Sequence, residues 1–353
     1  MGDAGWGVRV LVTGGAGYIG VVLCRQLVEA GHRPVVLDRM FFGRPAFDDG
    51  SVELIAGDLR ELRDEWFEGV DAVCHLGGLS NDPTAEYNTA ANWQMNAVAT
   101  ESLVAACKRH GIARFTFASS ASIYDREAGA DVRTTPMMCD EETAVEPRGA
   151  YSISKRHAER TILAAADETF APVVFRQGTV YGYSPRMRFD LVVNTFVKDA
   201  IVHRKLFLHG GGWMWRPLVD VRDVARVHVM AIESALEPIR GHIFNVLEEN
   251  YQIRQLGMLV AGSLSVMAPE LRVEIVEAPA PNVVRNYRMS NAKLSKATGF
   301  TPSVTVLESI EDMLRRFPLD ELATYSHPRY YNIQWMSLLE EVHAEQRGYG
   351  SIY

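Results

Sequence analysis

Short apolar runs alternate with amphipathic stretches along the first half of this 353-residue chain, and no other feature constrains its fold as strongly. The apolar runs predict β-strands at residues 8–12, 33–37, 52–56, 72–76, 114–119 and 172–176. The amphipathic stretches predict helices at 17–31, 92–110 and 150–168. Strands and helices that alternate in this way form βαβ units around a parallel sheet. Because the strand runs are almost wholly apolar, we expect helices on both faces of the sheet, which is a doubly wound α/β fold.

The alternation ends after Gly182, where the loops lengthen and carry glycine or proline clusters at 210–212 and 279–281. We therefore predict a smaller second lobe, formed by residues 183–215 and 250–353.

Residues 1–182 form the first domain, and residues 216–249 are expected to return to it with a late strand at 242–246. The tail after Pro318 shows no periodicity, so the sequence leaves open whether it wraps the body or forms a partner surface.

Composition narrows the classes of function. A net charge of −8 and a pI near 5.7 disfavour a nucleic-acid partner, because such proteins usually present a basic face. The four cysteines have neither metal-ligand nor disulfide spacing, so we expect no metal site and buried thiols at Cys24, Cys74, Cys107 and Cys139. The first apolar run is too short for a signal peptide or a membrane span, and a soluble cytoplasmic protein is expected.

A glycine-rich loop, Thr13-Gly14-Gly15-Ala16-Gly17-Tyr18-Ile19-Gly20, follows the first strand and opens the first helix. Glycines at this spacing permit a tight turn, close approach of a pyrophosphate and close packing of helix on strand. The helix N-terminus adds partial positive charge. Taken alone, the loop could also be a plain tight turn.

Asp38, at the end of the second strand, favours a dinucleotide site over a plain turn. A carboxylate there accepts hydrogen bonds from the adenosine ribose hydroxyls and repels a 2′-phosphate, which favours NAD over NADP. Arg39 beside it could soften that repulsion.

Tyr151 and Lys155 stand one helical turn apart, and Ser120 directly follows the fifth strand. A free tyrosine has a pKa of about 10, which a neighbouring ammonium and a positively charged nicotinamide would lower. A hydroxyl at a carboxyl strand end points into the ligand crevice of a parallel sheet. A Tyr-x-x-x-Lys pair alone is usually a solvated helix face; with Ser120 it predicts a base, its tuning group and a hydroxyl relay.

Eight motifs follow one another along the chain: Thr13–Gly20, Asp38, Gly57-Asp58-Leu59, His75-Leu76-Gly77-Gly78, Asn96, Ser119–Tyr124, Tyr151–Lys155 and Arg176–Gly182. In this order they resemble the motifs of the extended short-chain dehydrogenases/reductases, most closely the NAD-dependent sugar-nucleotide epimerases and dehydratases. The resemblance covers most of residues 8–315. It implies a Rossmann-type fold, bound NAD, a nucleotide-diphosphate sugar as substrate, and a homodimer formed by the helices at 92–110 and 150–168.

The resemblance also assigns roles. Tyr151 is the general base, Lys155 its electrostatic partner and nicotinamide-ribose ligand, and Ser120 the proton relay. Asp58 and Leu59 flank the adenine, and Asn96 is a structural and water-network residue. The implied cofactor contacts are Gly14, Gly17, Tyr18, Ile19, Gly20, Asp38, Asp58, Leu59, Leu76, Gly77, Gly78, Asn96, Ser119, Tyr151 and Lys155. The implied substrate contacts are Ser80, Ser120, Ser122, Tyr151, Thr179, Arg216 and Arg285.

Arg216 and Arg285 are the candidates for clamping the diphosphate, since a guanidinium can bind phosphate oxygens bidentately. The alternative is that both are surface arginines in salt bridges. Thr179 stands where many relatives carry asparagine, and Asp125 where glycine is common. A loop at 184–190 adds Arg186 and Arg188. The sequence leaves open whether these arginines bind the nucleotide, close a lid or face water.

Ala121 and Ser122 distinguish the possible reactions. Oxidation at C4 of the sugar leads to epimerisation, dehydration or net dehydrogenation. Dehydratases of this family carry an aspartate and a glutamate directly after the hydroxyl residue, and Ala121 and Ser122 cannot do that acid–base work. The sequence therefore favours 4-epimerisation through a transient 4-keto sugar, with the hydride returned from bound NADH.

Two alternatives remain. One is a dehydratase, 4-ketoreductase or dehydrogenase of a deoxysugar pathway, in which Glu86, Cys139 or Asp140 supplies the acid or base. The other is an NAD-binding sensor or scaffold without activity, against which the intact serine, tyrosine and lysine argue.

Overall fold

A computed structural model describes residues 7–45, 47, 50–125, 133–280, 285–317 and 322–349. Its centre is a seven-stranded sheet in the order β11-β7-β5-β4-β1-β2-β3, with every neighbouring pair parallel. The strands are β1 (Arg9–Thr13), β2 (Arg33–Asp38), β3 (Glu53–Ala56), β4 (Ala72–His75), β5 (Arg114–Ser120), β7 (Ala171–Gln177) and β11 (His242–Val246). Each begins and ends within one residue of its predicted bounds, so the predicted parallel α/β sheet is confirmed.

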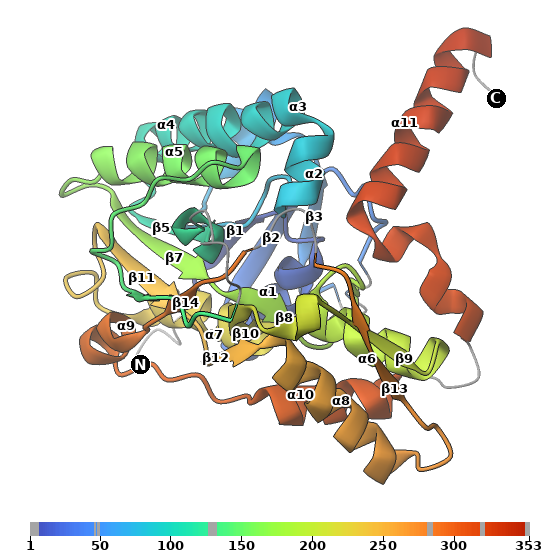
Figure 1. The fold of residues 1–353 in the computed structure, drawn as a ribbon. Helices are drawn as coiled ribbons and strands as arrows, with labels where there is room; N and C mark the ends of the chain where they lie inside the picture. The colour runs from blue at the N-terminus through green and yellow to red at the C-terminus, as the bar shows by residue number, and fades with distance from the viewer. Residues whose placement is uncertain are drawn as a thin grey trace.

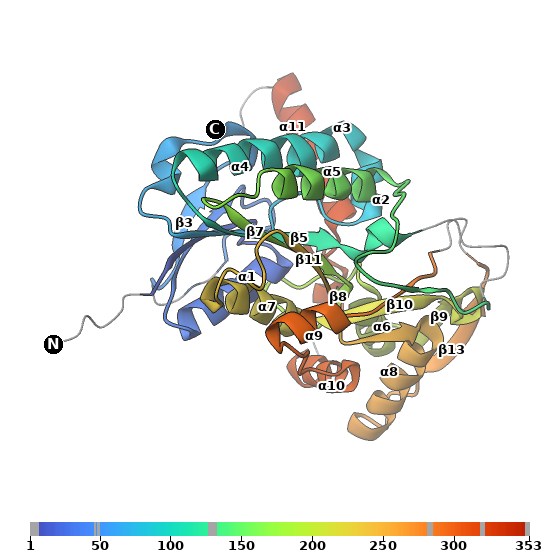
Figure 2. The ribbon, with the colours of Figure 1, turned by 90° about the vertical axis from the view of Figure 1, so that its left-hand side faces the viewer.

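Helices cover both faces of this sheet (Figures 1 and 2). The helices on one face are α1 (Tyr18–Glu29) and α7 (Val221–Glu233); those on the other are α4 (Ala99–Arg109) and α5 (Ala150–Ala164). Alternate residues of one strand serve opposite faces: Val10 and Val12 pack under α1 and α7, whereas Leu11 packs with α4 and α5. The predicted helix at 92–110 is longer, because α3 (Thr89–Trp93) and a π-helical turn, η3 (Gln94–Val98), lead into α4.

The second lobe has a three-stranded sheet in the order β12-β10-β8. Its strands are β8 (Thr179–Tyr181), β10 (Trp215–Asp220) and β12 (Glu249–Gln252). Helices α6 (Val192–Val202), α8 (Ile253–Met267) and α10 (Val306–Arg316) pack with it around a common apolar core. Two further strand pairs are β9 (Lys205–His209) with β13 (Glu274–Ala278), and β6 (Met138–Cys139) with β14 (Arg288–Met289), and α9 (Ala292–Thr298) packs on β11.

The boundary between the lobes differs from the predicted one. Only α7 and β11 return to the main domain, whereas β10 pairs in parallel with β8, which starts before Gly182. The turn at Gly178 permits this pairing: a Cβ there would lie 2.8 Å from the carbonyl oxygen of Pro217, so the chain passes closely beside β10.

Short helices complete the described fold. They are η1 (Leu59–Glu61), η2 (Asp64–Phe67), α2 (Asp82–Tyr87), η4 (Ala121–Tyr124), η5 (Gly210–Gly212), η6 (Leu322–Ser326) and η7 (Pro328–Tyr330). The last helix, α11 (Asn332–Tyr349), projects from the body (Figure 1). Before it, the tail is anchored by an aromatic cluster in which Phe189 meets Phe317, Tyr325 and Tyr330. The tail thus packs against the body.

All four cysteines are buried, as predicted. Among the helices that the structure describes, none combines the length and the apolar character that crossing a bilayer requires.

Candidate active site

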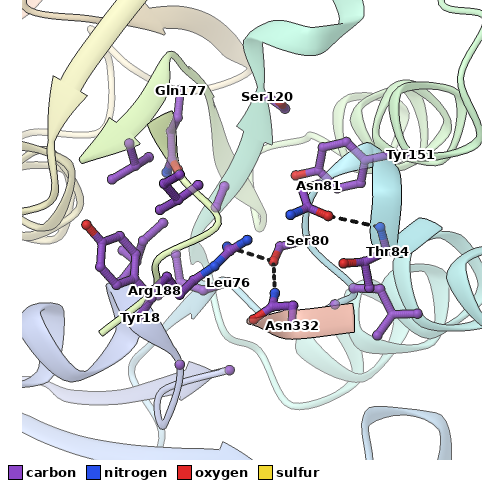
Figure 3. A pocket seen from close by; sticks show the side chains of 18 of the residues that line it. Tyr18, Leu76, Ser80, Asn81, Thr84, Ser120, Tyr151, Gln177, Arg188 and Asn332 are labelled. Atoms are coloured by element: carbon purple, nitrogen blue, oxygen red, sulfur yellow. Dashed lines mark hydrogen bonds between the residues drawn. The ribbon is translucent and has the colours of Figure 1, made fainter. Parts of the chain in front are cut away.

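A cavity of about 460 Å³ is lined by the carboxyl edge of the main sheet, the second lobe and the tail. Figure 3 shows part of it, with Ser120 and Tyr151 on one side and Tyr18, Arg188 and Asn332 below. Of the predicted site residues, those that line it are Gly14, Gly17, Tyr18, Ile19, Gly20, Asp38, Leu59, Leu76, Gly77, Gly78, Ser80, Ser119, Ser120, Ser122, Tyr151, Lys155, Thr179, Arg216 and Arg285.

The glycine loop forms a cradle that side chains would fill. Gly14 has φ +70°, and a Cβ on it would lie 2.8 Å from the backbone of Gly77. A Cβ on Gly20 would lie 2.4 Å from the carbonyl oxygen of Gly14. Gly17 is the N-cap of α1, so the free N–H groups of the helix face this loop. These features fit the pyrophosphate of a dinucleotide.

Asp38 lines the cavity at the end of β2. Its carboxylate accepts hydrogen bonds from the backbone N–H of Met40 (2.8 Å) and of Ala16 (3.2 Å). Arg39 also lines the cavity, but it is already paired: its Nη1 lies 3.2 Å from Asp58 Oδ2, and its guanidinium stacks 4.0 Å from the ring centroid of Phe41. Arg39 is therefore not free to offset the repulsion between Asp38 and a 2′-phosphate, which supports NAD as the cofactor.

Two predicted cofactor residues, Asp58 and Asn96, do not line the cavity. Asp58 caps η1 and is held by Arg60 and Arg39. Asn96 is buried and bonds both backbone polar groups of Leu79, so it fixes the loop after β4 from behind.

Ser120 ends β5, and Tyr151 and Lys155 stand in the first turns of α5. Lys155 is buried; its Nζ donates to the carbonyl oxygen of Ala118 at 2.9 Å, and burial lowers its pKa to about 8. Burial, and next the charge of Asp82, raise the pKa of Tyr151, whereas its hydrogen bond with Ser120 lowers it. Burial thus has the largest effect on the pKa of Tyr151, because it disfavours the charged phenolate.

A buried network holds α5 against the sheet. Arg176 of β7 bonds both carboxylate oxygens of Glu159 at 2.9 Å, and Ser119 donates to the same carboxylate at 2.7 Å. Arg176 also donates to the hydroxyl of Tyr124 at 2.8 Å. These contacts fix the helix that carries Tyr151 relative to the strand that carries Ser120.

The two candidate arginines lie in the cavity wall, not on the open surface. Arg216 donates to the carbonyl oxygens of Trp215 (2.8 Å) and Arg285, and its guanidinium faces the ring of Tyr287. Arg285 is held by two carboxylates, with Nη1 2.7 Å from Asp82 and Nε 3.2 Å from Asp125. Arg285 thus forms salt bridges, as the alternative expected, but it does so in the cavity wall, and Arg216 bonds backbone carbonyl groups there.

The sequence did not predict Asp82, which lines the cavity and is 6% exposed. Burial is the largest cause that raises its pKa, and Arg285 partly offsets this. The sequence does contain a pattern that marks the start of a helix here. Asn81 is the N-cap of α2 and accepts a hydrogen bond from the backbone N–H of Thr84, and Pro83 lies in the first turn of this helix, which follows β4.

Arg188 is buried beside the cavity and does not face water. It bonds both carboxylate oxygens of Asp190 at 2.9 Å and donates to Ser80 Oγ at 3.0 Å. Asn332 of the tail donates to the same hydroxyl at 3.1 Å (Figure 3). Ser80 is distant in sequence from both Arg188 and Asn332, so no local sequence pattern predicts these two hydrogen bonds.

The three residues considered as loop-borne acids or bases lie outside the cavity. Glu86 is exposed and accepts from the backbone N–H of Ala150, Asp140 is exposed and bonds Thr143, and Cys139 is buried in β6.

Comparison with known proteins places the chain in a family. The model of the NAD dependent epimerase/dehydratase family matches residues 10–246. A UDP-glucose 4-epimerase of Corynebacterium glutamicum is 27% identical over 332 residues, which cover 86% of this chain and 93% of that protein. The structure of MoeE5 with UDP-glucuronic acid and NAD is 27% identical and superposes with a TM-score of 0.73 over 88% of this chain and all (100%) of that one. A UDP-glucose 4-epimerase of Thermus thermophilus, in complex with NAD, is 25% identical, with a TM-score of 0.72 over 90% of this chain and 99% of the other. The chain is therefore an enzyme of the NAD-dependent epimerase/dehydratase family, within the extended short-chain dehydrogenases/reductases.

Proposed function

We propose that this enzyme is a sugar-nucleotide 4-epimerase. The observation that carries the proposal is the convergence of Ser120, Tyr151 and Lys155 on a cavity in which Ala121 and Ser122 provide no further acid or base. The names of the two relatives given above as UDP-glucose 4-epimerases support the same reaction.

The residues of the chain act on one hydroxyl. When bound, NAD would supply a hydride acceptor and a positive charge. Tyr151 takes the proton of the C4 hydroxyl, Ser120 relays it, and the ammonium of Lys155 stabilises the phenolate. The same groups return the proton after the 4-keto sugar has rotated in the site, so epimerisation needs no second acid–base pair.

Arg216 and Arg285 are proposed to bind the diphosphate of the substrate. Arg285 then exchanges part of its contact with Asp82 and Asp125 for phosphate oxygens. This exchange leaves two carboxylates near the sugar, which suits a substrate rich in hydroxyl donors.

Asp82 favours a second candidate function. It is a buried carboxyl group in the cavity wall whose charge raises the pKa of Tyr151. Such a group could supply the extra proton transfer that a dehydratase requires.

The test is incubation of the enzyme with UDP-glucose or UDP-galactose in D₂O, followed by proton NMR. A 4-epimerase interconverts the two sugars, keeps hydrogen at C5 and forms no net NADH. Tyr151→Phe should lower turnover by about 10²–10⁴-fold, because it removes the proton acceptor. Deuterium at C5 with loss of water would establish the dehydratase instead, and accumulating NADH a dehydrogenase.

We also infer a cytoplasmic homodimer that packs α4 and α5 of each copy together. The four buried cysteines support a reducing compartment, because their spacing fits no disulfide framework. Not every apolar residue of these helices is available for a dimer face: Leu103 and Ile162, for example, are buried in the chain's own core. Ile153 (41% exposed) and Trp93 (39% exposed) lie on the outer side, and sedimentation of Ile153→Asp should show a monomer if they form the interface.

A further inference from the structure

The C-terminal tail forms part of the cavity wall. Asn332, at the start of α11, and Met336, one turn later, both line the cavity that the glycine loop and Asp38 also line. Asn332 is 5% exposed and uses both ends of its amide: Nδ2 donates to Ser80 Oγ at 3.1 Å, and Oδ1 accepts from Arg186 Nη2 at 2.8 Å.

Two further contacts fasten the tail to the loop after β2 and to α2, the helix that follows β4. The indole N–H of Trp335 donates to the carbonyl oxygen of Phe41 at 2.6 Å, and Phe41 follows β2 three residues after Asp38. On the other side, the hydroxyl of Tyr87 in α2 donates to Glu340 at 2.9 Å. The tail thus bridges the loop that follows β2 and the segment that follows β4.

Arg186 beneath the tail has unused hydrogen-bonding capacity. Its guanidinium stacks 3.6 Å from the ring centroid of Phe42 and lines the cavity. Its Nε and Nη1 are buried and have no hydrogen-bond partner among the described residues. Burial, and next the charge of Arg188, lower the pKa of Arg186 to about 9. Because unpaired buried N–H groups of a cation are unfavourable, they indicate a ligand with acceptor oxygens at this place.

We propose that the tail is the outer wall of the NAD site and that Asn332 and Trp335 keep the cofactor from leaving. Asn332 holds Arg186 with its unpaired N–H groups toward the phosphate and ribose oxygens of the dinucleotide. Trp335 ties the tail to the loop beside the adenosine. Release of NAD then requires α11 to detach. This inference rests on the proposed function, because a 4-epimerase reuses one resident cofactor.

The experiment compares the full chain with a chain that ends at Tyr331 and with Asn332→Ala and Trp335→Phe. The shortened chain keeps Tyr325 and Tyr330, so the aromatic anchor of the tail is retained. Leu338→Ala is the matched control, since Leu338 is exposed on the same helix and does not line the cavity. Circular dichroism and thermal unfolding verify that each variant is folded.

The readouts are the NAD released per chain on denaturation and the rate at which bound NAD exchanges with isotopically labelled NAD, without any sugar. We expect near-stoichiometric, slowly exchanging NAD in the full chain and in Leu338→Ala. Exchange should be at least tenfold faster in the other three variants, and excess NAD should restore their turnover. Folded variants that exchange NAD at the rate of the full chain would overturn the inference, as would rapid exchange in the full chain. Failure of C4 inversion with retained NAD would overturn the proposed function alone.

Discussion

Among single residues, Lys155 carries a stability penalty that its proposed catalytic role explains. Burial lowers its pKa from 10.5 to about 8, so the folded chain binds this proton less tightly than the unfolded chain. The charged lysine therefore destabilises the fold below about pH 8, and the penalty disappears as the pH rises from about 8 toward 10.5. An ammonium that is unfavourable for folding is retained where a phenolate needs it.

We predict that Lys155→Met raises the free energy of unfolding of the cofactor-stripped protein by about 1–3 kcal/mol near neutral pH. The gain should shrink toward alkaline pH, while turnover falls at least about 100-fold. Urea unfolding at two pH values measures the first effect and steady-state kinetics the second. A variant less stable at neutral pH would mean that the bond from Nζ to Ala118 outweighs the cost of burial.

We predict that the charge of Asp82 affects the pH dependence of turnover. After burial, its charge is the largest cause that raises the pKa of Tyr151, so Asp82→Asn should lower that pKa. Activity rises with pH as the base loses its proton, and this limb of the pH–rate profile should move to lower pH by about half a unit to one unit. Glu86→Gln, an exposed change in the same helix, should leave the profile in place. Loss of turnover at every pH would instead make Asp82 a proton donor or acceptor.

The residues that could be predicted from sequence are those fixed by local geometry. Tyr151 and Lys155 are one helical turn apart, and Asp38 and Ser120 end strands that periodicity alone locates. Arg188 and Asn332 meet at Ser80 across 108 and 252 positions of sequence, so only the folded chain brings them together.

At the scale of secondary-structure elements, the position of α5 depends on the buried pair between Glu159 and Arg176. We predict that Arg176→Met lowers the free energy of unfolding by about 3–5 kcal/mol, because it leaves a carboxylate buried without its main partner. Replacing both residues by Met should recover most of the loss, since neither charge then remains. Urea unfolding of the two single variants and the double variant measures the coupling. Equal losses in the single and double variants would show that packing, not charge, dominates.

Periodicity predicted the seven strands of the main sheet but not the small sheet or the tail. The central strands β1, β4 and β7 are buried on both faces, so each is a mostly apolar run. In β12 no residue is fully buried, and β8 has three residues, which is too short to show a pattern. The register between β8 and β10 depends on the turn at Gly178, and α11 is held by single polar contacts instead of a continuous apolar stripe.

At the scale of the whole molecule, the cavity joins the two lobes, because the glycine loop lies on one and Arg216 on the other. A ligand that contacts both lobes stabilises both at once. NAD at about 100 times its dissociation constant should add about 2.7 kcal/mol to the free energy of unfolding. We therefore predict one cooperative thermal transition of the cofactor-stripped protein, which NAD moves to higher temperature.

The same measurement tests the choice of cofactor. NADP should move the transition little, because Asp38 repels its 2′-phosphate while Arg39 is held by Asp58 and stacked on Phe41. Asp38→Ser should reduce the shift produced by NAD, which loses its ribose acceptor, and increase the shift produced by NADP. Equal shifts for both cofactors in the unchanged protein would show that Arg39 leaves Asp58 to meet the phosphate. Two transitions, only one of them moved by NAD, would show that the lobes unfold independently and that one of them holds the cofactor by itself.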